Sequence, residues 1–333
     1  MTPEPTGRTV PPPVPTGPAA GPGAVTVRAH AKVNAQLAVG APRADGYHDL
    51  ANVFLAVGPH DAVTARPADR LRVTCSGPGS EQVPLDGTNL VARAAVLLAE
   101  RHGREPAVHL HIDKDIPVAG GMAGGSADGA AALLACDLLW GTATPRAELL
   151  ELCAELGSDV PFSLVGGAAL GRGRGERLTG LPVTGTFHWV FALADGGLST
   201  PVVYRECDRL REAAGETVPE VPEPDPAILV ALATGDAKAL AAALANDLQP
   251  AALALRPALA DTLAAGTRAG ALAAIVSGSG PTCAFLAEDA EAAGRVAAAL
   301  EASGTCRAAR VTTAPAPGAH RVPPESVAGV PDA

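Results

Sequence analysis

Residues 117–131 read PVAGGMAGGSADGAA, and an Ala/Leu-rich stretch continues from them to Trp140. The apolar segment 108–112 lies just before them, so the local order is strand, glycine loop and helix. Glycines allow the backbone to approach a ligand closely and to adopt positive φ angles. The free N–H groups and the positive dipole end of the following helix bind phosphate oxygens. This stretch therefore predicts a phosphate-binding loop at the start of a helix.

The loop differs from two common phosphate-binding sequences. No Gly-Lys-Ser/Thr closes it, which excludes a Walker A loop. It also lacks the G-x-G-x-x-G spacing and the acidic residue on a following strand that a dinucleotide-binding fold requires. A flexible connector is the alternative interpretation, and the long helix directly after the glycines argues against it.

A strict alternation begins at Val25. From there to residue 39 the odd positions carry Val, Ala or Leu, whereas the even positions up to 36 are polar. This period of two predicts a strand with one buried face, and Lys32 and Asn34 share its polar face. An ammonium there could neutralise a phosphate or a carboxylate, although a lone lysine more often lies on a solvated strand face. Lys32 still stands out, because only three of the 25 basic residues are lysines.

Three further features could take part in a ligand site. Asp159 follows a predicted helix over 146–156; alone it would more often cap a helix or a turn, but beside a lysine it could orient an alcohol for attack. Tyr47 and His48 lie in the turn RADGYHDL and could hold a base, or pack against the edge of a core. The glycine turn SGSGPT over 277–282 could donate backbone N–H groups to a ligand, or simply form a tight hairpin.

Length and composition limit the class of protein. At about 150 residues per domain, 333 residues predict two domains. A hydrophobic fraction of 47% excludes a wholly disordered chain, and a net charge of −10 argues against a broad nucleic-acid surface. The six cysteines are scattered without metal-site or disulfide spacing. With neither a membrane span nor a signal peptide in the sequence, we expect a cytoplasmic protein.

The order of patterns predicts an α+β architecture with an antiparallel sheet in its second part. We expect an N-terminal domain over 25–175 and a C-terminal domain over 176–313, between disordered Pro/Gly-rich arms at 1–24 and 314–333. The predicted helices cover 89–101, 146–156, 227–248, 257–269 and 289–303, and the predicted strands cover 25–39, 52–57, 108–112, 271–276, 283–287 and 308–313.

Taken together, these motifs resemble the GHMP kinase family. The loop over 117–131 is similar to the family's Pro-x-x-x-Gly-Leu-Gly/Ser-Ser-Ser-Ala phosphate loop, and SGSGPTCAFLA is similar to its C-terminal glycine motif. The motifs AKVNAQLAV, RADGYHDL and LGSDVPF narrow the resemblance to members that phosphorylate the 2-hydroxyl of a cytidine diphosphate-linked polyol in the non-mevalonate (MEP) isoprenoid pathway. The resemblance covers residues 25–313.

The resemblance implies a two-domain α+β kinase with its active site in the cleft between the domains. By motif position, Lys32 and Asp159 match the family's catalytic lysine and aspartate. The positions that match residues around the acceptor substrate are Asn34, Tyr47, His48, Thr200 and Tyr204, of which Tyr47 and His48 hold the cytosine and Tyr204 is the second stacking aromatic. The positions that match the ATP phosphate loop are Pro117, Val118, Ala119, Gly120, Gly121, Met122, Ala123, Gly124, Gly125, Ser126 and Ala127.

Three residues in this region depart from the family pattern. Ala123 replaces a commoner glycine, Ala127 replaces a serine, and Gly129 falls where alanine is usual. A glycine inside a helix costs about 1 kcal/mol relative to alanine. None of these changes removes the backbone donors of the loop, so we still expect it to bind ATP.

The implied cofactors are ATP and Mg²⁺, with Mg²⁺ held mainly through the phosphates because the sequence shows no carboxylate cluster around the loop. The implied partners are small molecules, with no nucleic acid and no membrane. A sister kinase for homoserine, mevalonate or a sugar is one alternative, and the Tyr47-His48 pair argues against it. A ligand-binding regulator on a kinase fold is another, and the presence of both Lys32 and Asp159 argues against that.

Overall fold

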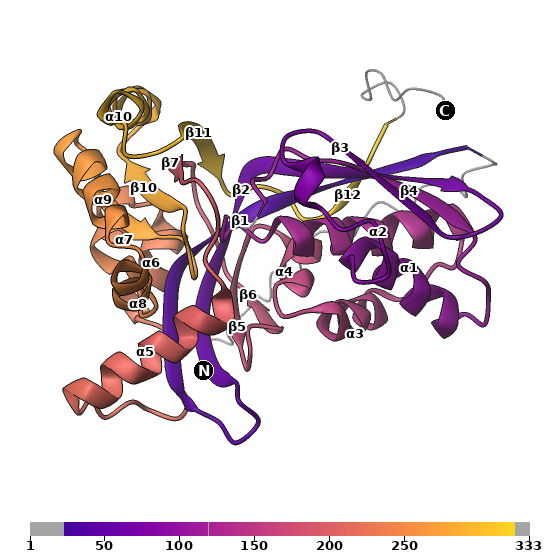
Figure 1. Cartoon of the computed structure of the whole chain (residues 1–333), viewed down its shortest axis with the longest axis horizontal. Helices are drawn as coiled ribbons and strands as arrows, with labels where there is room; N and C mark the ends of the chain where they lie inside the picture. Colours follow the sequence, from indigo (N-terminus) through magenta and orange to yellow (C-terminus); the bar gives the residue numbers. More distant parts are fainter. Residues whose placement is uncertain (1–22, 119, 324–333) are drawn as a thin grey trace, which may run out of the picture.

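The computed structural model describes residues 23–118 and 120–323 of the chain. Two sheets divide it into two halves, each with its own helices (Figure 1). The strands of the first sheet are β1 (Val25–Pro42), β2 (His48–Pro67), β3 (Arg72–Ser76), β4 (Val108–Asp113), β5 (Ala168–Arg172), β6 (Arg177–Gly180), β8 (Ala245–Asn246) and β12 (His320–Val322). The strands of the second sheet are β7 (Phe187–Leu193), β9 (Ala273–Val276), β10 (Cys283–Ala287) and β11 (Ala308–Ala314).

The helices fall into two groups along the chain. The first group consists of the short 3-10 helix η1 (Ser80–Gln82), α1 (Leu90–Arg101), α2 (Gly124–Trp140), α3 (Arg146–Leu156) and α4 (Val160–Val165). The second group consists of α5 (Thr200–Ala214), α6 (Pro226–Thr234), α7 (Ala237–Ala243), α8 (Gln249–Leu255), α9 (Ala258–Arg268) and α10 (Ala290–Ser303). Helices α1 to α4 gather on one face of the first sheet, at the right of Figure 1, while α6 to α10 lie with the second sheet at the left. The predicted α+β class is confirmed.

The long β1–β2 hairpin connects the two halves. In the first sheet β1 lies between β12 and β2, and it also pairs in parallel with β8 at Gln36↔Ala245. Val33 belongs to a core that also contains residues of α2. Leu37 lies beyond a bulge between Asn34 and Gln36, on the opposite face of the strand, and belongs to a second core that contains Phe285 of β10. One continuous strand therefore contributes to both hydrophobic cores.

The strand that the alternation predicted is confirmed, but a bulge between Asn34 and Gln36 interrupts the alternation, and the polar face before the bulge is not solvated. Lys32 is 5% exposed and Asn34 is 2% exposed, almost as deeply buried as the Val and Ala residues of the other face. These side chains are covered by the glycine loop, where the Gly121 carbonyl accepts from Lys32, and by the turn after β9, where Gly278 packs against Asn34. Buried polar side chains need hydrogen-bond partners. The buried polar face of β1 therefore indicates a network of polar contacts at this place.

The predicted helix over 227–248 is wrong in extent. The chain forms α6 and α7 with a break between them, and then turns into β8. Gly235 ends α6 with a φ of 73°, and the Asp236 side chain caps α7 by accepting hydrogen bonds from the N–H groups of Lys238 and Ala239. A glycine after one helix and an aspartate before the next are ordinary stop and start signals. The surrounding run of alanine and leucine masked them.

Further elements differ from their predicted extents. Strand β2 begins at His48 and runs to Pro67, well beyond the predicted 52–57, and α5 and α8 were not predicted as helices. Helices α1, α3, α9 and α10 and strands β4, β9, β10 and β11 lie within two residues of their predicted bounds. The six cysteines are all free thiols, as their spacing predicted.

The predicted disordered tail from residue 314 is wrong as far as residue 323. The chain leaves β11, crosses back to the first half and forms β12, which pairs antiparallel with β1 at Thr26↔Val322. Ala316 and Val322 are buried in this segment. Pairing with β12 covers the free edge of β1, which would otherwise expose unpaired backbone groups. The other predicted arm residues, 1–22 and 324–333, lie outside the described residues.

The predicted boundary between domains at 175 and 176 stays a prediction, since β8 and β12 join the first sheet from farther along the chain. In the part of the chain that the structure describes, we find no helix that is long and apolar enough to span a membrane.

Two helical glycines differ in their surroundings, and this difference yields a test of the packing. A Cβ added to Gly294 in α10 would meet nothing within 4 Å, whereas one added to Gly129 in α2 would lie 3.2 Å from the Cβ of Leu90 in α1. We expect Gly294→Ala to raise the free energy of unfolding by about 0.5–1 kcal/mol, because alanine loses less backbone entropy than glycine on folding. Gly129→Ala should bring no such gain, because it crowds the α1–α2 contact. Urea unfolding of both variants provides the measurement, and an equal gain at the two sites would contradict this account.

Three histidines lie together where β12 joins the first sheet. The His30 ring of β1 stacks on that of His320 at 5.7 Å between centroids, and it lies 5.2 Å from the ring of His60 in β2. Burial, together with the neighbouring His60 and His320, lowers the pKa of His30 to about 4. As the pH falls from about 6.5 toward 4, the unfolded chain therefore takes up a proton that folded His30 resists.

This shift predicts a pH dependence of stability. The wild-type free energy of unfolding should fall between about pH 6.5 and about pH 4 by an amount that His30→Gln removes, because glutamine does not titrate. Denaturant unfolding of both proteins at about pH 7 and about pH 5 measures this difference. The carboxyl groups that titrate in the same range are present in both proteins, so their contribution cancels in the comparison. Equal losses in the two proteins would rule out His30 as the source.

Candidate active site

A cleft of about 1050 Å³ lies between the two halves, with lining residues from β1, the glycine loop and the start of α4 on one side and from α5 and the turn after β9 on the other. Its volume is at the upper end of the range typical for small-molecule sites. The predicted site residues that line it are Lys32, Asn34, Tyr47, His48, Pro117, Val118, Gly120, Gly121, Ala123, Gly124, Gly125, Ser126, Asp159, Thr200 and Tyr204. Met122 and Ala127 are instead buried in the core beneath the loop. Ala119 lies outside the described residues.

The Lys32 ammonium connects β1 to two other segments. Its Nζ donates hydrogen bonds to Asn34 Oδ1 at 2.6 Å and to the carbonyl oxygen of Gly121 at 3.1 Å. It also lies 3.7 Å from Asp159 Oδ2. The lysine and the aspartate, which the sequence could only propose as a pair, therefore meet in the structure.

The Asp159 carboxylate is not used for capping. The residue stands at the N-cap position of α4, but its side chain makes no hydrogen bond to the helix N–H groups. The side chain is 32% exposed and lines the cleft, while that of Lys32 is 7% exposed. A carboxylate that is held close to an ammonium and open to the cleft can accept a proton or a hydrogen bond from a bound alcohol.

Asn34 extends the network around Lys32 to the neighbouring strand and to the second half. Its Nδ2 donates to Asn52 Oδ1 of β2 at 2.8 Å. A Cβ on Gly278 would lie 3.1 Å from Asn34 Oδ1, and Gly278 has a φ of +57°, so this turn needs glycine in order to pack against the site. Asn52 was missed in the sequence, and its only signal was a polar residue at the start of a predicted strand.

The glycine loop leads into α2 as predicted. The N–H groups of Gly124, Gly125 and Ser126 lie in the first turn of the helix, where they have no partner within the helix, and these residues line the cleft. A side chain at Gly121 would collide with the carbonyl oxygen of Ser277 from the second half. Ala123 adopts a left-handed φ of 61° where glycine is commoner in the motif that the loop resembles, so this departure retains the backbone shape at a cost in strain.

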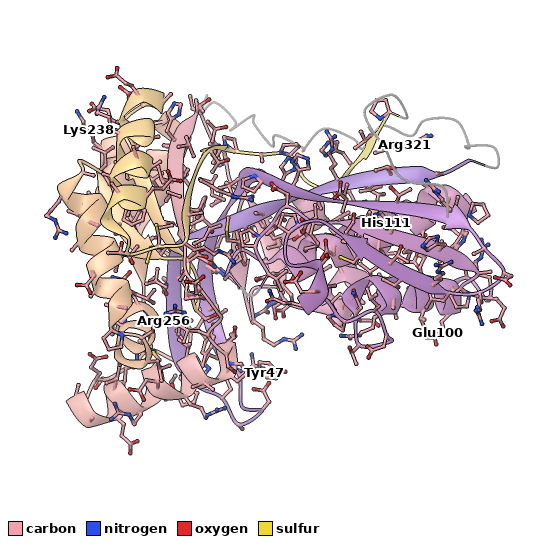
Figure 2. The ribbon with its side chains drawn as sticks, turned by 45° about the horizontal axis from the view of Figure 1, so that its top comes forward. Tyr47, Glu100, His111, Lys238, Arg256 and Arg321 are labelled. Carbon is pink, nitrogen blue, oxygen red and sulfur yellow. The ribbon has the colours of Figure 1, made fainter. Side chains whose placement is uncertain are left out.

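Aromatic and charged side chains gather at the other end of the cleft. Tyr47, at the tip of the β1–β2 hairpin (Figure 2), is 52% exposed. The Arg174 guanidinium lies 5.2 Å from the centroid of the Tyr47 ring. The His48 ring lies 5.1 Å from the Tyr204 ring, and His48 Nε2 is 2.9 Å from Asp208 Oδ1. Tyr204 and Asp208 are four residues apart on α5, so they share one face of that helix.

The sequence motifs did not predict several residues at this end of the cleft. Arg174 and Asp208 are separated from Tyr47 and His48 by more than a hundred positions, and neither belongs to one of the motifs. Ser279, within the glycine turn SGSGPT, has its hydroxyl 2.9 Å from that of Thr200. The turn therefore contributes a side chain to the cleft as well as backbone.

A buried ion cluster lies beside the glycine loop. Lys114 Nζ donates to Asp61 Oδ2 at 2.5 Å and to Asp128 Oδ2 at 2.7 Å. Burial raises the pKa of the Asp128 carboxyl, and the negative charge of Asp61 raises it further. Both carboxylates are engaged with the lysine, and among the described residues no group of His, Cys, Asp and Glu side chains is arranged to hold a metal ion.

Comparisons with known proteins agree with this geometry. Residues 89–167 match the family model described as GHMP kinases N terminal domain, and residues 228–306 match the one described as GHMP kinases C terminal. The chain is 72% identical over 295 residues to the 4-diphosphocytidyl-2-C-methyl-D-erythritol kinase of Streptomyces avermitilis, covering 89% of this chain and 98% of that protein. It is 56% identical over 304 residues to the protein of the same name from Mycolicibacterium smegmatis, covering 91% of this chain and 94% of that one.

Solved structures show the same likeness. A crystal structure of 4-(cytidine 5'-diphospho)-2C-methyl-D-erythritol kinase superimposes with a TM-score of 0.71 at 33% identity, covering 87% of this chain and 99% of that chain. A homoserine kinase from Cytophaga hutchinsonii superimposes with a TM-score of 0.69 at 20% identity, covering 90% and 97%. At 20% identity, the similarity to the homoserine kinase shows a shared fold alone.

Proposed function

The chain belongs to the GHMP kinase family, and we propose on that basis that it transfers the γ-phosphoryl group of ATP to the 2-hydroxyl of 4-diphosphocytidyl-2-C-methyl-D-erythritol. This reaction belongs to the non-mevalonate pathway to isoprenoid precursors. The observation that carries the proposal is the Lys32–Asp159 pair, which lies in one cleft with the glycine loop and the aromatic side chains Tyr47 and Tyr204. One part of the cleft suits a triphosphate and the other suits a flat base.

In the proposed mechanism Asp159 orients the acceptor hydroxyl and takes its proton. The oxygen of that hydroxyl forms a bond to the γ-phosphorus, the bond from the γ-phosphorus to the bridging oxygen of ADP breaks, and ADP leaves. Such transition states are loose, so catalysis consists mainly of positioning and charge stabilisation. Lys32, 3.7 Å from Asp159, offsets negative charge on the carboxylate and on the moving phosphoryl group.

The proposed roles at the two ends of the cleft follow from their chemistry. The unpartnered N–H groups at the start of α2 hold phosphate oxygens of ATP. At the other end, the cytosine stacks between Tyr47 and Tyr204, and Asp208 fixes the orientation of His48 beside it. Arg174 and Arg205 line this part of the cleft and supply positive charge for the diphosphate of the acceptor.

Mg²⁺ fits the cleft as an ion held chiefly by the phosphates and water, with the Ser126 hydroxyl as the side-chain donor at the start of α2. When bound, it neutralises charge on the β- and γ-phosphate oxygens. Small molecules are the proposed partners of this acidic chain, which carries a net charge of −10, rather than nucleic acid or membrane lipid, and the cytoplasm is its proposed location.

The proposal predicts which acceptor supports turnover. With ATP and Mg²⁺, the purified protein should release ADP with 4-diphosphocytidyl-2-C-methyl-D-erythritol and not with homoserine, mevalonate or galactose, because only the first carries a base for the aromatic end. A coupled assay of ADP release with a blank lacking acceptor measures this. Turnover with another acceptor would support the proposed kinase activity and contradict the proposed substrate. ATP binding without turnover on any acceptor would favour a binding regulator.

The proposed role of Asp159 has a test of its own. Asp159→Asn should leave ATP affinity close to that of the wild type and lower kcat by about 10²- to 10⁴-fold, because the amide cannot take the proton. Nucleotide titration and steady-state kinetics on the same preparation separate binding from turnover. A kcat near that of the wild type would show that Asp159 is not the proton acceptor.

A further inference from the structure

The ion cluster of Asp61, Lys114 and Asp128 has no part in the mechanism above, although Lys114 and Asp128 line the cleft. All three side chains are buried, and they come from β2, from the segment after β4 and from the first turns of α2. Buried ion clusters contribute little to stability compared with apolar residues of similar volume, because taking the charges out of water is costly. A cluster at this place is therefore better explained by the geometry that it imposes than by the stability that it adds.

Asp61 holds the chain where it enters the glycine loop. While its Oδ2 binds Lys114, its Oδ1 accepts hydrogen bonds from the backbone N–H groups of Asp115 at 2.7 Å and Ile116 at 2.8 Å. These two residues directly precede Pro117, the first residue of the loop. The start of the loop is thus fixed to β2.

Lys114 and Asp128 hold the other end of the loop. Lys114 Nζ, already bound to Asp61, donates a second hydrogen bond to Asp128 Oδ2, one turn into α2. A Cβ on Gly124, the first residue of α2, would lie 3.2 Å from Lys114 Nζ, so the start of the helix packs directly on the ammonium. Burial lowers the pKa of Lys114, but Asp128 and Asp61 outweigh this effect and raise it, so the side chain stays charged.

We propose that the ion cluster of Asp61, Lys114 and Asp128 sets the two ends of the glycine loop relative to each other, and so positions its backbone N–H groups for the phosphates of ATP. The three are positioning residues that act through the loop. The inference rests on the proposed use of this loop for ATP, and it concerns nucleotide binding and not the identity of the acceptor. Preorganised donors bind phosphate well because the loop loses little conformational entropy on binding.

The composition of the cluster suggests how to test it. Removing Lys114 would leave two buried carboxylates without their cation, which could unfold the protein. Removing Asp128 instead leaves Lys114 paired with Asp61, one charge of each sign, while the link to α2 is lost. Asp128→Ala is thus the informative variant, and Asp128→Asn, which retains an oxygen to accept the Lys114 hydrogen bond, is its conservative counterpart.

Asp137 provides a matched control on the same helix. It is also buried, and its Oδ1 accepts hydrogen bonds from the Thr142 hydroxyl at 2.8 Å and the Thr144 N–H at 2.9 Å, near the end of α2 that is far from the loop. Asp137→Ala should lower stability without changing the loop.

The experiment is titration of each folded variant with ATP and Mg²⁺, without acceptor, followed by KM for ATP and for the acceptor. We expect Asp128→Ala to raise the Kd of ATP by about 10- to 100-fold, the effect of a displacement on the order of 1 Å. Asp128→Asn and Asp137→Ala should bind ATP about as well as the wild type does, and KM for the acceptor should change little in any variant. Wild-type affinity in Asp128→Ala, or an equal loss in Asp137→Ala, would overturn the proposal.

A second variant at Asp128 and the absence of acceptor from the binding assay keep the result interpretable. If Asp128→Ala does not fold, Asp128→Ser takes its place, because the serine hydroxyl can bond to its own helix backbone but is too short to replace the carboxylate on Lys114. The same loss of ATP affinity is then expected, and wild-type affinity would again overturn the inference. Since ATP binding is measured without acceptor, failure of the proposed acceptor in the wild-type assay is a separate outcome from failure of the ion cluster to position the loop.

Discussion

The Lys32 ammonium is buried where three segments of the chain meet. The arrangement of the site depends on the hydrogen bonds and the ion pair that this ammonium requires. Its partners are Asn34 on its own strand, the Gly121 carbonyl in the glycine loop and the Asp159 carboxylate before α4. A buried ammonium without partners is strongly unfavourable, so each contact also fixes the position of its segment. The backbone adds to this, because the Lys32 N–H donates to the carbonyl of Met122. The charge that the proposed mechanism uses is thus also a structural constraint.

The second half of the molecule completes this arrangement by close backbone approach. A side chain at Gly121 would collide with Ser277, and one at Gly278 would crowd Asn34 and strain a left-handed backbone. Asn246 of β8 donates to the carbonyls of Val276 and Gly278 and so fixes the turn that makes these contacts. The glycines that the sequence suggested as ligand donors therefore also allow the two halves to pack together.

Charge is distributed locally and not evenly over the protein. The chain carries a net charge of −10, yet Lys32, Arg174 and Arg205 all line one cleft. Short-range contacts dominate such a site because charges farther apart are screened by salt. An acidic protein can thus bind two phosphate-bearing substrates without a basic surface overall.

The sequence by itself determined the elements whose signals are local. The period of two in β1, the glycine loop before α2 and the helix over 146–156 were all predicted, because period, capping and turn residues lie within a few positions of each other. The motifs in their order also identified the Lys32–Asp159 pair. Only the tertiary structure decided that the polar face of β1 is buried, that β12 returns to pair with β1, and that Asp61 meets Lys114. Partners such as His48 and Asp208 lie 160 positions apart, and spacing carries no information about contacts that form only when separate elements pack together.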